Sequence, residues 1–177
     1  ELSLLMPALA HVSANELSWV VCVAPPLPPY APAWAAAGVA LSRLLVTRAI
    51  GGDAAWACAR ALDAEGVGAL VAWLPESNPA TLRRLQLLAE KSRTLIFLFR
   101  PASVVRESSP APLRIGIAAA NPANGCGRLS LRLFKRRGGA LDAPLELDIA
   151  RPAPLPHAVA GTPPSAAAAR SLPAAVA

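Results

Sequence analysis

The sequence predicts an α/β fold with a mostly parallel central sheet and an antiparallel C-terminal edge. In residues 18–99, four short apolar strand segments alternate with helical patterns, and this order is typical of parallel strands joined by crossover helices. In residues 113–149, apolar residues recur at every second position, which is typical of strands with one face in water. We therefore expect helices on both faces of a parallel sheet and an antiparallel extension at its edge.

The first elements follow from local spacing. Apolar residues at helical spacing predict a helix over about 2–14, and the strand expected at 18–24 is apolar on both faces, as strands are when helices cover both sides of a sheet. A proline-rich turn then ends at Tyr30, and a short alanine-rich helix runs to about Ala37. Gly38 ends that helix before a second strand.

Three strands and two helices complete the parallel half. The second strand is expected at 44–47, and Asp53 is expected to cap the helix that Gly66 ends. The third strand is expected at 69–74. Pro79 suits the first turn of a helix. The apolar face of that helix comprises Leu82, Leu85, Leu88 and Ala89. The helix leads to a fourth strand, which is expected at 94–99.

The C-terminal part of the chain has a different pattern of apolar residues from the parallel half. Strands are expected at 113–117, 128–134 and 145–149, separated by turns rich in Gly, Asn and Pro. Beyond residue 150 the composition is dominated by Pro, Ala and Ser, which cannot bury enough apolar surface to offset the entropy of ordering. We expect one domain over 1–150 and a disordered tail over 151–177.

Composition narrows the class of protein. No apolar run reaches the roughly 20 residues that a membrane-spanning helix needs, so we expect a soluble protein. Cys22, Cys58 and Cys126 form no metal-ligand pattern, and their odd number argues against a disulfide framework, which favours a reducing cytoplasm. Because Glu1 opens directly into an apolar helical pattern, we expect the natural N-terminus to lie upstream.

The positive charge is concentrated in one stretch. The net charge is +6, but residues 83–137 hold twelve basic and two acidic side chains, whereas residues 1–82 hold three basic and six acidic ones. Contact with nucleic acid or an acidic partner would explain this, and so would a solvated, arginine-rich surface.

Several strings in the chain resemble a known family. Residues 37–47 and 53–71 resemble the RecA recombinase core in order and spacing, and residues 128–149 resemble its antiparallel edge. The closer resemblance is to the RecA-like ImuA proteins, which take part in damage-induced translesion synthesis, and a more distant one is to the cell-division inhibitor SulA. The sequence segments that carry this resemblance lie at 1–9, 23–26, 72–75, 82–87, 97–101 and 135–139. The last string and the strand after it favour ImuA.

Departures from active RecA indicate what this chain does not do. The magnesium-binding aspartate of RecA falls at Trp73, the water-activating glutamate falls within 24–26, and the sensor glutamine falls at about Arg100. Phosphoryl transfer needs a metal ion and a positioned water, so the resemblance implies a non-catalytic protein without a metal or cofactor. A phosphate-binding loop would precede residue 1, and nucleotide binding therefore stays open.

The candidate site residues are basic. In RecA the segment that corresponds to Lys135, Arg136 and Arg137 meets the nucleotide of a neighbouring subunit, so the resemblance implies a retained protein interface. A solvent-facing strand end is the alternative. The full set of candidates for partner or DNA binding is Lys135, Arg136, Arg137, Arg132, Arg83 and Arg84. If they meet nucleic acid, they would contact phosphates without reading bases, and Phe134 could stack.

Other conspicuous residues favour structural roles. Trp73 could be an interface hot spot, but core packing is the simpler interpretation. His11 and His157 form no catalytic triad or metal pattern, and Cys22 lies in an apolar strand. No catalytic or metal residue is predicted.

The leading functional hypothesis follows from the resemblance. It is an accessory protein of SOS translesion synthesis, which links ImuB and an error-prone polymerase to damaged DNA or RecA. The alternative is a SulA-type inhibitor that binds the division protein FtsZ. A third class, an ATPase that remodels protein on DNA, predicts phosphate release.

Overall fold

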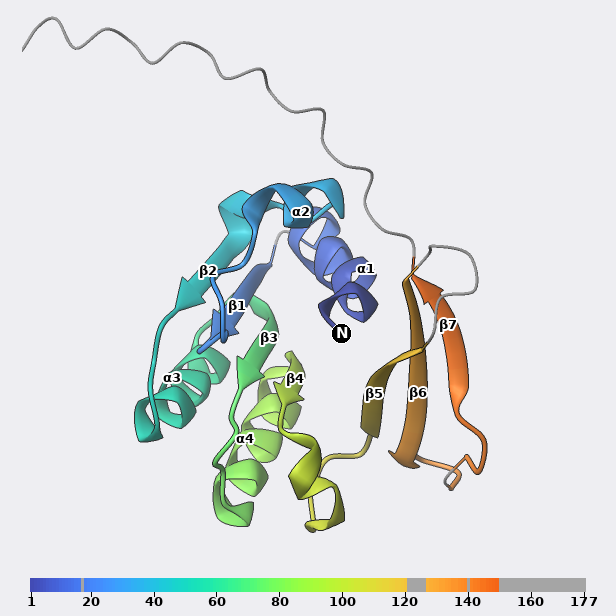
Figure 1. Cartoon of the computed structure of the whole chain (residues 1–177). Coiled ribbons are helices and arrows are strands. Elements are labelled where there is room, and N and C mark those ends of the chain that lie inside the picture. The colour runs from blue at the N-terminus through green and yellow to red at the C-terminus, as the bar shows by residue number, and fades with distance from the viewer. Residues whose placement is uncertain (17, 121–126, 140, 150–177) are drawn as a thin grey trace, which may run out of the picture.

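A four-stranded parallel sheet forms the centre of the molecule, in the order β2-β1-β3-β4 (Figure 1). The computed structural model describes residues 1–16, 18–120, 127–139 and 141–149. The strands of this sheet are β1 (Trp19–Val23), β2 (Leu44–Thr47), β3 (Val67–Trp73) and β4 (Leu95–Phe99). The predicted α/β class is confirmed, and each strand begins within two residues of its predicted position.

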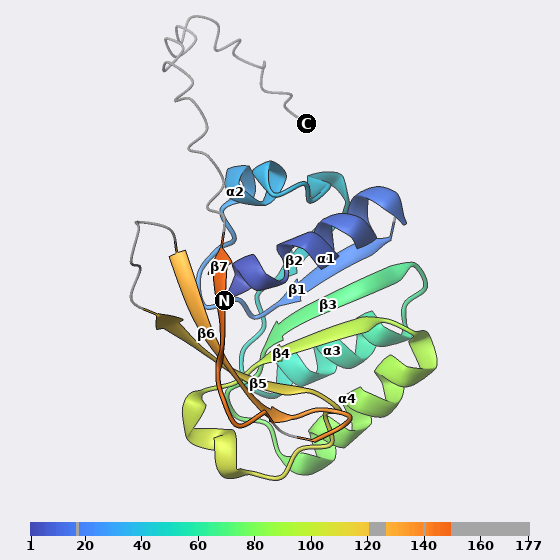
Figure 2. The ribbon, with the colours of Figure 1, turned by 90° about the vertical axis from the view of Figure 1, so that its right-hand side faces the viewer.

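Helices cover both faces of this sheet and make a three-layer core (Figure 2). On one face, α1 continues at both ends in short helical turns, and α2 lies beside it. On the other face α3 and α4 pack side by side. Their bounds are η1 (Leu2–Leu4), α1 (Met6–Ala10), η2 (His11–Asn15), α2 (Ala31–Ala36), α3 (Gly52–Asp63) and α4 (Pro79–Ser92).

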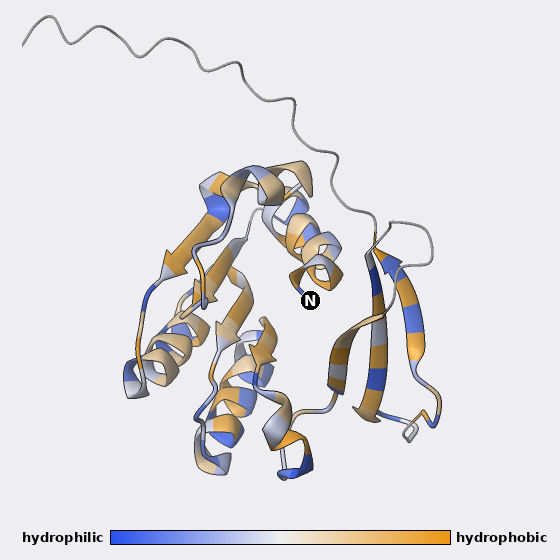
Figure 3. Cartoon of the chain, viewed as in Figure 1, coloured by the Kyte–Doolittle hydropathy of each residue, from blue (hydrophilic) through white to orange (hydrophobic). Residues whose placement is uncertain are grey.

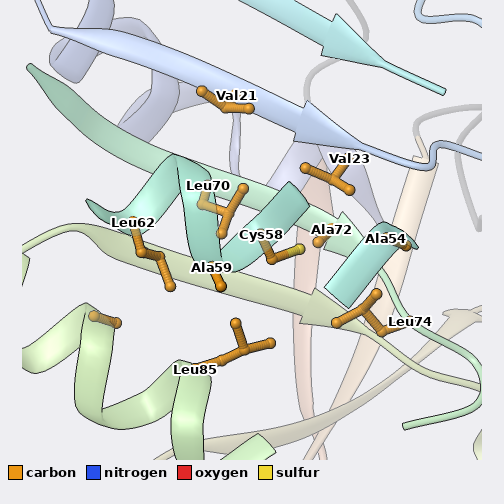
Figure 4. Close-up of a cluster of buried hydrophobic side chains, with 11 residues drawn as sticks. Val21, Val23, Ala54, Cys58, Ala59, Leu62, Leu70, Ala72, Leu74 and Leu85 are labelled. Atoms are coloured by element: carbon orange, nitrogen blue, oxygen red, sulfur yellow. The ribbon is translucent and has the colours of Figure 1, made fainter. Parts of the chain in front are cut away.

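Alternate residues of the central strands feed two separate cores. Figure 4 shows one of them, in which Val23 of β1 and Leu70 of β3 meet Cys58 of α3, with Leu85 of α4 on the same side. The opposite cluster lies under α1 and α2 and comprises Leu9, Val12, Val20, Cys22, Trp34, Val39, Ala69 and Val71. The central strands can therefore be apolar on both faces without exposing apolar surface to water, because helices cover each face of the sheet.

The helix starts differ in how they are capped. At α4 the Asn78 side chain accepts a hydrogen bond from the Thr81 N–H at 2.8 Å, which satisfies one of the donors that a helix start leaves open. Asp53 does not cap α3 as expected. The cap position belongs to Gly51, whose φ of 57° lets the chain turn into the helix earlier and leaves Asp53 in the first turn.

The C-terminal strands form a sheet of their own. They are β5 (Arg114–Ala120), β6 (Gly127–Lys135) and β7 (Leu145–Ile149), paired antiparallel in the order β5-β6-β7. We expected them to extend the edge of the parallel sheet, but no pairing joins β4 to β5 in the described residues. The antiparallel character is confirmed, and its continuity with the central sheet is not.

A short helix separates the two sheets. After β4 the chain enters η4 (Ala102–Arg106), which the sequence analysis missed. The Arg114 guanidinium donates hydrogen bonds of 2.9–3.2 Å to the carbonyl oxygens of Val104, Val105 and Glu107. These bonds fix the end of η4 to the start of β5, so β5 begins away from the free edge of β4 (Figure 1).

Some expectations fall outside the described residues. They include the tail over 151–177, part of the turn between β5 and β6, and Cys126. Among the helices that are described, none has the length and hydropathy to span a bilayer.

Candidate interaction surface

Two stacked aromatic rings lie at the carboxyl ends of β3 and β4. Trp73 and Phe99 pair across the strands, and their ring centroids lie 5.0 Å apart with an interplanar angle of 18°. Both side chains pack against the core cluster under α1 and α2. The place where the resemblance puts a magnesium-binding aspartate therefore holds an indole with a packing role.

The end of β1 is equally poor in ligand groups. Ala24 follows the strand with a left-handed φ of 53°, and its N–H donates to the Thr47 carbonyl of β2 at 2.9 Å. Pro25 and Pro26 come next. An alkyl side chain and two pyrrolidine rings can neither bind a metal ion nor accept a proton.

An open cleft of about 520 Å³ lies beyond the ends of β3 and β4. Arg100 spans it and donates to the Ser77 carbonyl at 3.1 Å and to the Glu107 carboxylate at 3.2 Å. Its Nε is buried and has no partner among the described residues. Glu76 also lines the cleft. The sequence analysis did not consider Glu76 and Glu107, although their loops follow strand ends, where ligands of such sheets bind.

The acidic side chains of the cleft belong to no larger cluster of metal-ligating groups among the described residues. Within the described part of the chain, no three His, Cys, Asp or Glu side chains are close enough together to hold a metal ion. Among the described residues, the polar contacts of the His11 ring are local, with Asn15 at 3.0 Å and Glu16 at 3.6 Å. Cys22 and Cys58 are buried, and burial raises the pKa of each thiol to about 12.

The predicted basic segment follows directly from β6, and its three side chains differ in their contacts. Lys135, the last residue of β6, donates from Nζ to the Ser109 carbonyl at 3.0 Å. Arg136 donates from Nε to the Gly139 carbonyl at 2.8 Å, across a turn in which Gly139 has a φ of 94°. Arg137 is exposed, and no partner for it is found in the described residues. Of the three, Arg137 is the most available for a ligand.

The other candidates fall into two places. Arg132 lies on β6 and is exposed, directly opposite Gly116 of β5. Arg83 and Arg84 are exposed on α4, which covers the parallel sheet. The structure therefore brings Arg132 close to the segment 135–137 along one strand, but it assigns Arg83 and Arg84 to a different layer of the molecule.

A bulge in β6 changes which side chains share a face. Ile115 pairs with Leu133 and Arg114 with Lys135, so Phe134 is an extra residue in β6. Its ring covers Gly116, where a Cβ atom would lie 2.7 Å from the ring atom Cε2. Phe134 remains 41% exposed. The missing Cβ of Gly116 thus provides the space that the Cε2 edge of this ring occupies.

The two faces of the antiparallel sheet differ strongly, because hydrophobic and hydrophilic residues alternate along its strands (Figure 3). One face is apolar across all three strands, and its residues are Ile115, Ile117, Leu129, Leu131, Leu133, Leu145, Leu147 and Ile149. The other face is polar. At its far end Arg128 binds Asp148 through two bonds of 2.7 and 3.2 Å and Glu146 through one of 3.4 Å. The Arg128 guanidinium holds the pKa of Asp148 below its usual value.

Comparison with solved structures gives a partial likeness. No family model matches the chain, and no curated protein is similar to it. Among solved structures, the chain is similar to SulA from Pseudomonas aeruginosa at 25% sequence identity, over 56% of this chain and 85% of that one, with a TM-score of 0.48.

Proposed function

We propose that this chain is a non-catalytic, RecA-like accessory protein of SOS-induced translesion DNA synthesis. In this role it links ImuB and an error-prone polymerase to damaged DNA or to RecA. The protein works through contacts and performs no phosphoryl transfer.

The observation that carries the proposal is the stack of Trp73 on Phe99 at the ends of β3 and β4. Hydrolysis of a phosphoanhydride bond needs a carboxylate-bound metal ion and an activated water near these strand ends. An aromatic pair that packs on the core leaves no room for such a group at this position. The proline pair after Ala24 supports the same interpretation.

The connection from β6 to β7 supports the ImuA type of protein over the SulA type. The string 135–139 resembles ImuA, and the expected strand after it is present as β7, paired with β6 through Leu129–Leu147 and Leu131–Leu145. A partner that meets the basic turn would therefore rest against a completed three-stranded sheet.

The competing function is inhibition of cell division through FtsZ. It is supported by the strings at 82–87 and 97–101, which resemble SulA, and the first of these exposes Arg83 and Arg84 on α4. The two functions thus use different surfaces, α4 in one and the turn after β6 in the other.

A binding experiment separates them. Purified chain is passed over immobilised ImuB, RecA and FtsZ, with two variants of matched design. The Lys135, Arg136 and Arg137 triple alanine variant should lose ImuB or RecA, and the Arg83→Ala, Arg84→Ala variant should not. Binding of FtsZ that depends on Arg83 and Arg84 would support the competing function instead. Retention of all partners by the triple variant would refute the proposed surface.

A further inference from the structure

The polar face of the antiparallel sheet combines an exposed aromatic ring with cationic side chains. We call it the Phe134 face and define it by Arg114, Gly116, Arg132, Phe134 and Lys135. Residues paired directly across a sheet share a face, so Gly116 and Arg132 lie together, and the ring over Gly116 lies beside Arg132. The bulge at Phe134 keeps Lys135 next to Arg114, its register partner, on the same end of the sheet.

The cationic side chains of this face form no ion pair among the described residues. Arg114 and Lys135 donate to backbone carbonyls, which carry no net charge, so both side chains keep their full positive charge. Arg132 is exposed and has no partner in the described residues. The acidic residues of β7 on this side of the sheet, Asp148 and Glu146, pair with Arg128, although Glu146 lies opposite Ser130, two residues from Arg132.

The ring is presented for stacking. The edge of the Phe134 ring meets Gly116, the one residue of β5 without a side chain, and Phe134 is 41% exposed, so part of the ring is open to solvent. Bases stack on such rings whatever their sequence, and the gain is about 1–3 kcal/mol for each base. In a duplex the bases already stack on each other, so only an unpaired base can use the ring.

We propose that the Phe134 face binds single-stranded nucleic acid. Phe134 stacks on one base, Arg132 contacts a flanking phosphate, and the strand continues past Arg137 in the turn after β6. This inference rests on the proposed function, in which the protein meets damaged DNA, and it names the form of DNA and the surface that binds it. An acidic peptide could use the guanidinium groups, but it would leave the exposed ring without a partner.

The test is fluorescence anisotropy of a labelled 20-nucleotide oligo(dT) titrated with the full chain. Phe134→Leu keeps an apolar cover over Gly116 but removes the π face, and we expect about fivefold weaker binding or more. Phe134→Trp keeps a ring and should bind at least as tightly as the parent. Arg132→Gln should weaken binding and reduce the slope of log K against log salt concentration by about 0.7, as expected for the loss of one phosphate contact on a single strand.

Arg48→Gln is the matched control, because it removes the same charge from an exposed site after β2 that belongs to none of the candidate surfaces. It should leave the affinity within about twofold and the salt slope unchanged. Circular dichroism and a thermal melt establish that each variant is folded. The inference is overturned if Phe134→Leu and Arg132→Gln bind like the parent, if a duplex of equal length binds more tightly, or if polyglutamate displaces the oligonucleotide as well as unlabelled oligo(dT) does.

The outcome is distinguishable from failure of the proposed function. Phe134→Leu should keep its binding to ImuB, since the partner contacts are assigned to Arg136 and Arg137 in the turn. A chain that binds ImuB but not oligo(dT) overturns the inference alone. A chain that binds oligo(dT) through Phe134 but neither ImuB nor RecA refutes the proposed function and keeps the nucleic-acid surface.

Discussion

Trp73 and Phe99, the last residues of β3 and β4, form a stacked pair directly across the two strands, with ring centroids 5.0 Å apart. Because both rings also pack on the core under α1 and α2, this pair ties the carboxyl ends of the sheet to the helical layer. The same place would hold catalytic carboxylates in a RecA-type ATPase. Here it is part of the hydrophobic core.

The first prediction concerns the stability that this pair provides. Trp73→Ala should lower the free energy of unfolding by about 2–3 kcal/mol, since it removes a large, partly buried side chain and its aromatic contact. Urea denaturation followed by circular dichroism measures the change. Trp56→Ala is the matched control, because Trp56 is 65% exposed and should cost less than about 1 kcal/mol. Equal losses for the two variants would contradict the packing role of Trp73.

A second prediction addresses the start of α4. Asn78→Ala should destabilise the protein by about 1 kcal/mol, because the Thr81 N–H loses its acceptor. Asn78→Asp should restore most of this stability, since a carboxylate accepts the same bond and lies at the positive end of the helix dipole. If the aspartate variant is no more stable than the alanine variant in thermal melts, the capping geometry is wrong.

The third prediction concerns the two buried thiols. In a Cys126→Ser background, Cys22 and Cys58 should react with a disulfide reagent at pH 8 only upon unfolding, because burial raises the pKa of both thiols to about 12. A raised pKa in the folded state adds stability that is complete below pH 9 and is lost as the pH rises toward 12. The protein should therefore become less resistant to urea above pH 9. Rapid labelling of the native chain at pH 8 is the contrary result.

A fourth prediction concerns the ion pair at the far end of the antiparallel sheet. The hydrogen bonds from Arg128 hold the pKa of Asp148 below its ordinary value, so Asp148 should titrate at lower pH than a free aspartate. Its depressed pKa contributes stability above the unfolded value, and this contribution is lost as the pH falls through the folded pKa. Carbon-detected NMR of the carboxyl group measures the titration. Arg128→Gln should return the pKa of Asp148 to its ordinary range, and an unchanged titration in this variant would argue against the pair.

The elements of the parallel half could be predicted from the sequence because their signals are local. Apolar runs between Gly and Pro residues define β1 to β4, and the helical spacing of Leu82, Leu85 and Ala89 defines the buried face of α4. The capping residue expected for α3 is Asp53, but the helix starts two positions earlier, after Gly51 with its positive φ. Sequence alone does not report φ.

The arrangement of the second sheet could not be predicted, because it depends on contacts between distant residues. Alternation in 114–149 identifies strands with one wet face but not the edge that β5 joins. In the folded chain, three hydrogen bonds from Arg114 join the start of β5 to the end of η4, and η4 itself is too short to show a period. The bulge at Phe134 was likewise hidden, although Gly116 in an alternating strand is a signal for close approach of another group.

The candidate site was predicted in part. The exposed positions of Arg132 and Arg137 agree with the basic segment that the sequence singled out. The structural bonds of Lys135 and Arg136 could not be foreseen, because their acceptors, the carbonyls of Ser109 and Gly139, come together only in the folded chain. Arg83 and Arg84 are exposed as expected, but on a helix that belongs to the other sheet.

The central claim is that the chain acts as an adaptor through the turn after β6, and partner binding tests it most directly. In biolayer interferometry with immobilised ImuB, the parent chain should bind. The triple alanine variant of Lys135, Arg136 and Arg137 should bind at least about tenfold more weakly. This corresponds to a loss of about 1.4 kcal/mol or more, which charge-assisted contacts supply. No binding to ImuB together with saturable binding to FtsZ would contradict the account.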